Sequence, residues 1–187
     1  MVSITCYGGA SEIGGNEIIV EVDDTCLSFD FGTSFGRRHE YFDEYLKPRP
    51  GMGLSDMLYT GLLPSLDGIY RQDLVPTADF WERWRSAAHY RQLALDGGLL
   101  SHAHVDHSGY ISFLDPEIPV YSIVMTAVIS KAMRDGGQTD FEREVCYAHL
   151  REPRETVLRA SKVGRQRSGS AADRAHNQAS QSDARSY

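Results

Sequence analysis

The chain has 187 residues, of which 41% are hydrophobic and 24% charged, values ordinary for one globular domain with a single main core. Its net charge of −7 argues against a generally basic, nucleic-acid-binding surface, although it leaves room for a local basic groove. The sequence contains neither a run of about 18 apolar residues nor an N-terminal leader pattern, so we expect no membrane span and a cytoplasmic protein. The odd number and wide spacing of Cys6, Cys26 and Cys146 argue against a disulfide framework or a cysteine zinc site, and predict three buried thiols.

The N-terminal third shows the period of β-strands. Residues 2–7 alternate apolar and polar side chains and predict a half-buried strand with Val2, Ile4 and Cys6 on one face. A glycine-rich loop follows at 8–15, and two further strands are predicted at 17–22 and 26–31. Tight turns between them indicate an antiparallel meander. Asp30 ends the third strand, where a carboxylate either serves a functional site or caps the chain.

Residues 33–96 break this rhythm and form an inserted helical and irregular segment. Helices are predicted at 37–46, 54–58 and 79–93, the last from the common face of Phe80, Trp84, Ala87 and Ala88. The tyrosines and tryptophans of this segment are expected to pack in the core or in a lid, rather than to stack on nucleic-acid bases.

Residues 99–109 read LLSHAHVDHSG and contain four potential metal ligands within six positions: His102, His104, Asp106 and His107. The motif lies where a short buried strand turns into a helix. Extended backbone would place the first three side chains on one side, and His107 would swing to a neighbouring position. Imidazole and carboxylate are suited to zinc and similar divalent ions. The motif predicts a metal site; the alternative is a loop of solvated polar residues.

After the motif, the pattern predicts a short helix at 110–114, a strand at 120–123, and helices at 126–134 and 141–150. Alternating strands and helices after a meander are typical of layered α/β domains. From residue 161 the chain contains no Leu, Ile, Phe, Met or Trp. We therefore expect one domain over 1–160 and a tail over 161–187 that is disordered or of non-native reading frame.

The motif His102-x-His104-x-Asp106-His107 matches in full the H-x-H-x-D-H pattern of the metallo-β-lactamase fold. The loop Gly8-Gly9-x-x-Glu12-Ile13-Gly14-x-Asn16 and the strand end Phe29-Asp30-x-Gly32 resemble the opening of ribonuclease J and the related β-CASP RNA-processing nucleases. The resemblance implies the N-terminal half of an αββα sandwich, apparently truncated.

The same resemblance implies a zinc-dependent hydrolase that cleaves RNA phosphodiesters as a ribonuclease or exonuclease. His102 and His104 would hold one zinc ion and Asp106 and His107 a second, with a hydroxide shared between them. Asp106 would orient that hydroxide or accept its proton, and Asp30 would order the metal loop from behind. Two alternatives remain open: a hydrolase of thioesters or small phosphodiesters with the same fold, and a non-catalytic fragment.

The resemblance ends near residue 150. The later histidines, the bridging aspartate and the inserted β-CASP domain of that family are not evident in this sequence. His149, in a predicted helix, and His176, in the tail, are not expected to replace a missing ligand. With half of the ligand set, we expect reduced metal affinity and an inactive fragment. The sequence leaves the oligomeric state open.

Overall fold

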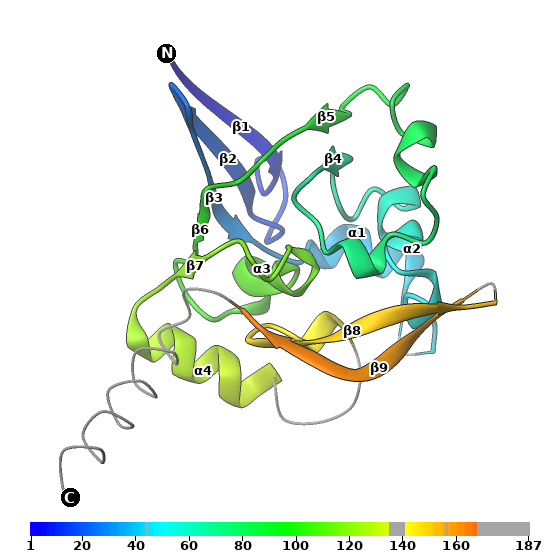
Figure 1. Cartoon of the computed structure of the whole chain (residues 1–187). Coiled ribbons are helices and arrows are strands. Elements are labelled where there is room, and N and C mark those ends of the chain that lie inside the picture. Colours follow the sequence, from blue (N-terminus) through cyan, green and yellow to red (C-terminus); the bar gives the residue numbers. More distant parts are fainter. Residues whose placement is uncertain (44, 135–140, 156, 168–187) are drawn as a thin grey trace, which may run out of the picture.

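A computed structural model of the chain describes residues 1–43, 45–134, 141–155 and 157–167. These residues form a mixed α/β fold built on a five-stranded mixed sheet (Figure 1). The strands are β1 (Val2–Gly8), β2 (Glu17–Val22), β3 (Thr25–Phe31), β4 (Leu66–Asp67), β5 (Arg91–Gln92), β6 (Gly97–Leu99), β7 (Val120–Tyr121), β8 (Tyr147–Arg154) and β9 (Val157–Gln166). The helices are α1 (Phe35–Tyr41), α2 (Ser55–Tyr59), α3 (Val105–Ser108) and α4 (Val124–Arg134), with short 3₁₀ turns at Pro50–Met52, Gln72–Leu74, Phe80–Arg83, Ile111–Phe113 and Phe141–Arg143.

The main sheet has the order β1-β2-β3-β6-β7. Its first three strands pair antiparallel, which confirms the predicted meander. β6 then pairs parallel to β3, with Phe29 opposite Leu99, and β7 pairs parallel to β6. Because these three strands run in the same direction, their carboxyl ends meet at one edge of the sheet. The histidine motif follows β6 at that edge.

The segment 33–96 fills one side of this sheet. Its apolar residues form the centre of the core together with Phe31 of β3 and with the turn after the motif. The Tyr70 ring lies 6.2 Å from Phe31 and stacks 6.1 Å from Trp81, and its hydroxyl donates a 2.6 Å hydrogen bond to the Pro64 carbonyl. Trp81 and Trp84 pack against the core as predicted.

Two predicted helices are absent from the described residues. The stretch 79–93 forms a 3₁₀ turn, further turns and strand β5, because the Phe80 ring is buried in the core and Arg91–Gln92 pair with Leu66–Asp67. The stretch 141–150 forms a 3₁₀ turn and the start of β8. The helices at 54–58 and 126–134 are confirmed in α2 and α4, within one or two residues.

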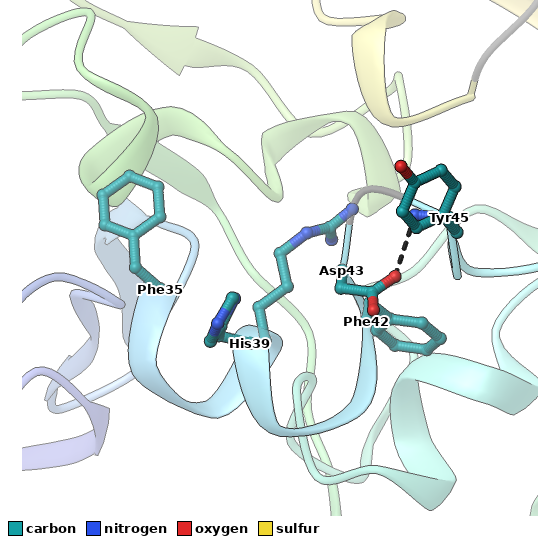
Figure 2. Close-up of a pocket in the computed structure, with 6 residues that line it drawn as sticks. Phe35, His39, Phe42, Asp43 and Tyr45 are labelled. Carbon is teal, nitrogen blue, oxygen red and sulfur yellow. Dashed lines mark hydrogen bonds between the residues drawn. The ribbon is translucent and has the colours of Figure 1, made fainter.

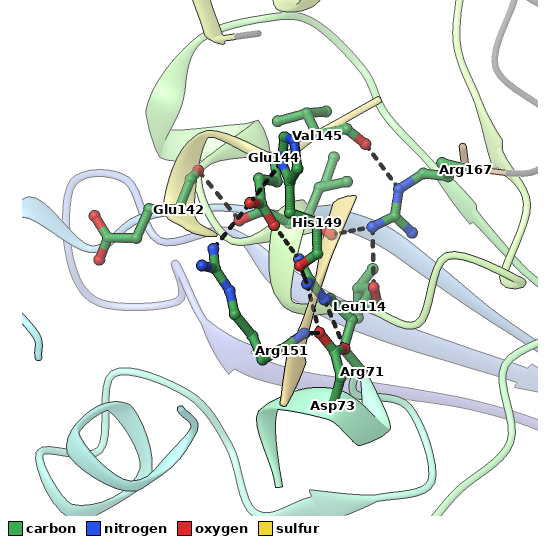
Figure 3. A network of polar contacts seen from close by, with 11 residues as sticks. Arg71, Asp73, Leu114, Glu142, Glu144, Val145, His149, Arg151 and Arg167 are labelled. Carbon is green, nitrogen blue, oxygen red and sulfur yellow. Dashed lines mark hydrogen bonds and ion pairs between the residues drawn. The ribbon is translucent and has the colours of Figure 1, made fainter. Parts of the chain in front are cut away.

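The β8–β9 hairpin is anchored by buried arginines (Figure 3). The fully buried Arg71 donates to both oxygens of Asp73, at 3.0 and 2.7 Å, and to Glu144 at 2.7 Å, while Arg151 of β8 donates to Glu144 at 2.8 Å. Arg167 donates to four backbone carbonyls, and its burial lowers its pKa to about 10. The several hydrogen bonds that each of these arginines forms offset the free-energy cost of burying its charge.

This hairpin corrects the predicted boundary at residue 161. β9 runs to Gln166, and the buried Arg167 follows it, so the ordered part of the chain continues past the expected start of the tail. The prediction of a tail was based on the lack of large apolar residues after residue 160. In the structure, hydrogen bonds from buried arginines hold this part of the chain in place instead. The remainder of the predicted tail, 168–187, lies outside the described residues.

The other face of the main sheet is solvent-exposed. Val2 and Ile4 are 65% and 66% exposed, and the Cys6 thiol is exposed too, which corrects the predicted buried face of the first strand. Of the three cysteines, Cys26 is buried as expected and Cys146 is half-buried. Among the helices of the described ranges, none has both the length and the apolarity that a bilayer crossing requires.

Candidate functional site

Three of the motif's side chains form an imidazole cluster at the carboxyl edge of the sheet. The His102 ring lies 4.7 Å from the His104 ring and 4.0 Å from the His107 ring. The carboxylate of Asp106, one residue before His107, reaches within 3.5 Å of His107 Nε2. The structure therefore places the four predicted ligands in a row of pairwise contacts, from the end of β6 to the first turn of α3.

Asp30, at the end of β3, holds this cluster from behind. Its Oδ1 accepts a 2.8 Å hydrogen bond from the Ser101 amide, and its Oδ2 accepts bonds from the Ser101 hydroxyl at 2.8 Å and from His107 Nδ1 at 2.7 Å. The backbone of Asp30 has a positive φ of 56°, a conformation unusual for residues other than glycine. A positive-φ backbone that directs the carboxylate to His107 and Ser101 favours the functional interpretation of Asp30 over simple capping.

Ser101 fixes which nitrogen each histidine presents. Because its hydroxyl proton is donated to Asp30, the hydroxyl oxygen must accept the 2.9 Å bond from His102 Nδ1. His107 likewise donates its Nδ1 proton to Asp30. Both rings are thereby assigned the tautomer with an unprotonated Nε2, the atom that binds a metal, and in His107 this atom accepts a 3.3 Å bond from the Asn16 side-chain amide. The sequence analysis missed Ser101, and its position directly before the motif was the available signal.

The glycine loop packs directly against the motif. A side chain at Gly32 would collide with the carbonyl oxygen of Asp106, and a Cβ at Gly14 would lie 2.7 Å from the Asp106 Cβ. Asn16, from the same loop, donates its backbone amide to the Asp106 carbonyl at 3.2 Å, and its side-chain nitrogen lies 3.3 Å from His107 Nε2. The glycines are required here because two backbone segments approach more closely than any side chain permits.

The donor set fits zinc in its chemistry and in the hydrogen bonds behind it. A ligating histidine typically donates its other ring nitrogen to a carboxylate or hydroxyl, as His107 and His102 do here. The 3.5 Å between His107 Nε2 and Asp106 Oδ2 is close to the spacing of about 3.4 Å that two ligands of a tetrahedral zinc ion require. Within the described ranges, no three His, Cys, Asp or Glu side chains converge as a preformed metal site. Binding by three donors therefore requires His102 or the exposed His104 to rotate.

The other two histidines considered from the sequence do not join this cluster. His149 lies in β8 rather than in a helix, and its Nδ1 faces Glu144 at 3.2 Å in the network that anchors the hairpin. His176 lies outside the described residues.

No protein-family model matches this chain, and no curated protein matches it. Among solved structures, the chain is similar to the crystal structure of a protein of unknown function from Enterococcus faecalis V583, with 28% sequence identity and a TM-score of 0.51. The similarity covers 72% of this chain and 28% of that chain. This chain thus spans less than a third of the length of its structural relative, and the match supports a shared fold without naming an activity.

Proposed function

We propose that this chain carries the metal-binding half of a zinc-dependent hydrolase of the metallo-β-lactamase fold, acting on RNA phosphodiesters. One observation carries the proposal: His102, His104, Asp106 and His107 lie next to one another at one edge of the sheet, and the bonds to Asp30 and Ser101 leave Nε2 of two of the rings unprotonated. A mixed α/β sheet with its site at the strand ends supports this fold. A cytoplasmic location belongs to the same proposal.

The residues have distinct roles in this proposal. His102 and His104 would hold one zinc ion, and Asp106 and His107 a second. The chemistry that zinc supplies when bound is Lewis-acid polarisation of a phosphate oxygen and acidification of water. Asp106 Oδ2, the only carboxylate among the four ligands, would accept the proton of the attacking water. Asp30 would keep the His107 ring oriented through its 2.7 Å bond to Nδ1.

The choice of RNA rests on the glycine loop. Its sequence resembles the RNA-processing branch of the fold, and in the structure Gly14 of this loop, like Gly32 after β3, lies against Asp106 where a side chain would collide. A hydrolase of thioesters or small phosphodiesters would use the same four ligands, so substrate choice has to be measured.

Zinc binding and RNA cleavage test the proposal together. We expect calorimetric zinc titration to detect binding that Asp106→Ala weakens strongly and that Asp30→Asn weakens about 10- to 100-fold, because loss of an orienting partner costs this much in metal sites. Because half of the ligand set lowers the activity expected of this chain, zinc binding is the primary readout, and RNA cleavage, where the zinc-loaded chain shows it, should be lost in Asp106→Ala. Asp24→Ala, an exposed carboxylate in the β2–β3 turn, is the matched control and should change neither readout.

Three results would count against the proposal. Full zinc binding and cleavage in Asp106→Ala would remove that residue from the site. Zinc binding with hydrolysis of a thioester or a cyclic phosphodiester, but not of RNA, would favour the alternative hydrolase. A chain that binds no zinc would leave only the non-catalytic fragment.

A further inference from the structure

Helix α1 and the residues after it expose aromatic side chains beside the histidine cluster. Phe35, the first residue of α1, is 50% exposed, and Tyr45 is 90% exposed. An open pocket of about 650 Å³ lies between them. Its lining residues, named here the aromatic groove, are Phe35, Arg38, His39, Phe42, Asp43 and Tyr45 (Figure 2).

One end of the aromatic groove, at Phe35, lies near the candidate metal site. A Cβ built on Gly14 would lie 2.7 Å from the Asp106 Cβ and 3.6 Å from the Phe35 ring, so this ring and the Asp106 side chain face the same point of the glycine loop. A second pocket of about 420 Å³ shares Phe35 and Arg38 with the groove and extends to Val105 and Gly109, on either side of the motif's last ligands. The two pockets therefore adjoin at Phe35 and Arg38, and together they are called the path below.

The charges along this path favour an anionic ligand. The Asp43 carboxylate accepts hydrogen bonds from the backbone amides of Tyr45 and Leu46, both at 2.8 Å, and these bonds lower its pKa. Glu142, the acid of the second pocket, forms a two-bond pair with Arg38 at 3.0 Å. The second pocket is also lined by two cations, and neither Lys47 nor Arg143 forms an ion pair with another described residue.

We propose that the aromatic groove binds single-stranded RNA and guides it to the histidine cluster, an inference that rests on the proposed function. Unpaired bases would stack on Phe35 and Tyr45, and the backbone phosphates would contact Lys47 and Arg143. Proteins bind single strands without sequence preference by combining positively charged side chains along the backbone with aromatic rings on which the bases stack. A duplex keeps its bases paired and cannot use exposed rings in this way. Although the chain as a whole has a net charge of −7, the two acids beside the path, Asp43 and Glu142, are already hydrogen-bonded to other groups.

Fluorescence anisotropy with a labelled 12-nucleotide oligoadenylate tests this inference on the full chain. The titration is run in EDTA, so that its result does not depend on zinc. Phe35→Ala and Tyr45→Ala should each weaken binding about 5- to 100-fold, the range for one lost base stack. Tyr45→Phe, which keeps the ring, should retain affinity. Tyr59→Ala, which removes an exposed ring outside both pockets, should leave affinity unchanged.

The salt dependence gives a second readout. Lys47→Ala should weaken binding and reduce the slope of log affinity against log salt by about 0.7, because one phosphate contact is lost. Lys131→Ala on the exposed side of α4 is the matched control.

These results separate the groove from the metal chemistry. If Asp106→Ala keeps oligoadenylate affinity while Phe35→Ala loses it, the groove is supported even where the hydrolase proposal fails. Affinity that both ring deletions leave unchanged, or equal affinity for a duplex, would overturn the inference while leaving the zinc test intact. Absence of measurable binding would overturn it too, and would leave the exposed rings to a protein partner.

Discussion

The two faces of the main sheet differ in a way that reverses the usual association of apolar side chains with burial. The inner face carries Ile19, Cys26 and Ser28, with Glu17 at its edge, and all four are buried. The segment 33–96 and the turn after the motif cover this part of the sheet. The outer face is almost entirely apolar, yet much of it meets solvent. The strand registers place these residues on it: Val2, Ile4, Cys6, Ile18, Val20, Val22, Leu27, Phe29, Leu99 and Tyr121.

The comparison shows that coverage, rather than composition, decides burial in this chain. The inner face tolerates polar residues because a helical and irregular segment seals it. The outer face has apolar side chains in continuous cross-strand pairs, and no described residue seals it to the same degree. Exposed apolar patches of this continuity are uncommon on globular proteins and promote association.

The largest effect is expected from one substitution made on both faces. Ile19→Ala should destabilise the chain by about 2–5 kcal/mol, because it leaves a cavity at a fully buried position, whereas Ile4→Ala should cost less than about 1 kcal/mol. Urea unfolding followed by tryptophan fluorescence measures both. Equal losses would show that the outer face is covered in solution.

A smaller, pH-dependent effect is expected from Glu17. Burial raises the pKa of this carboxyl well above its ordinary value of 4.5, outweighing the nearby Arg37, and its Oε1 has no hydrogen-bond partner. The folded state thus prefers the protonated acid. Stability from this group is present below about pH 4.5 and is lost as pH rises toward the folded pKa.

Glu17→Gln removes that loss. The variant should match the wild type near pH 4.5 and exceed its stability by about 1–3 kcal/mol at pH 8, the cost of burying an unpaired polar group. Urea midpoints across this pH range provide the measurement. A difference that does not change with pH would mean that Glu17 titrates as an exposed acid.

The smallest change in stability is expected on the outer face. Ile4→Thr keeps a β-branched side chain in β1 and should change the free energy of unfolding by no more than about 0.5 kcal/mol. It should reduce concentration-dependent light scattering, because it interrupts the apolar patch. Thr25→Ser on the same face removes no comparable apolar area and serves as the control. Scattering that Ile4→Thr leaves unaltered would exclude the patch as the cause of association.

Local sequence signals predicted the elements that depend on local periodicity. The meander follows from alternation, and α4 follows from the helical spacing of its apolar residues. The gathering of the four motif residues also follows, because they lie within six positions of one turn. Sequence alone did not identify Ser101, because its role depends on the parallel register that places Leu99 beside Phe29 and so brings Ser101 to Asp30.

The wrong predictions share a long-range cause. The stretch 141–150 has a helical pattern, but Glu144 is used by Arg71, which lies 73 positions earlier in the chain. The predicted buried face of β1 was wrong because alternation distinguishes the two faces of a strand but does not show which of them the rest of the chain covers. Propensity scales contain neither the Arg71–Glu144 bond nor the burial of one face of β1, because both depend on the tertiary fold.

The bond between Asp30 and Ser101 also bears on the order of folding. These residues are 71 positions apart, and β3 and β6 can pair only after the chain between them has compacted. Closing so long a loop has to precede the contact that rewards it, and parallel pairings of this kind are formed slowly. We therefore expect the site to form only once this long loop has closed, so that an ion or a nucleotide captured there would report on that closure.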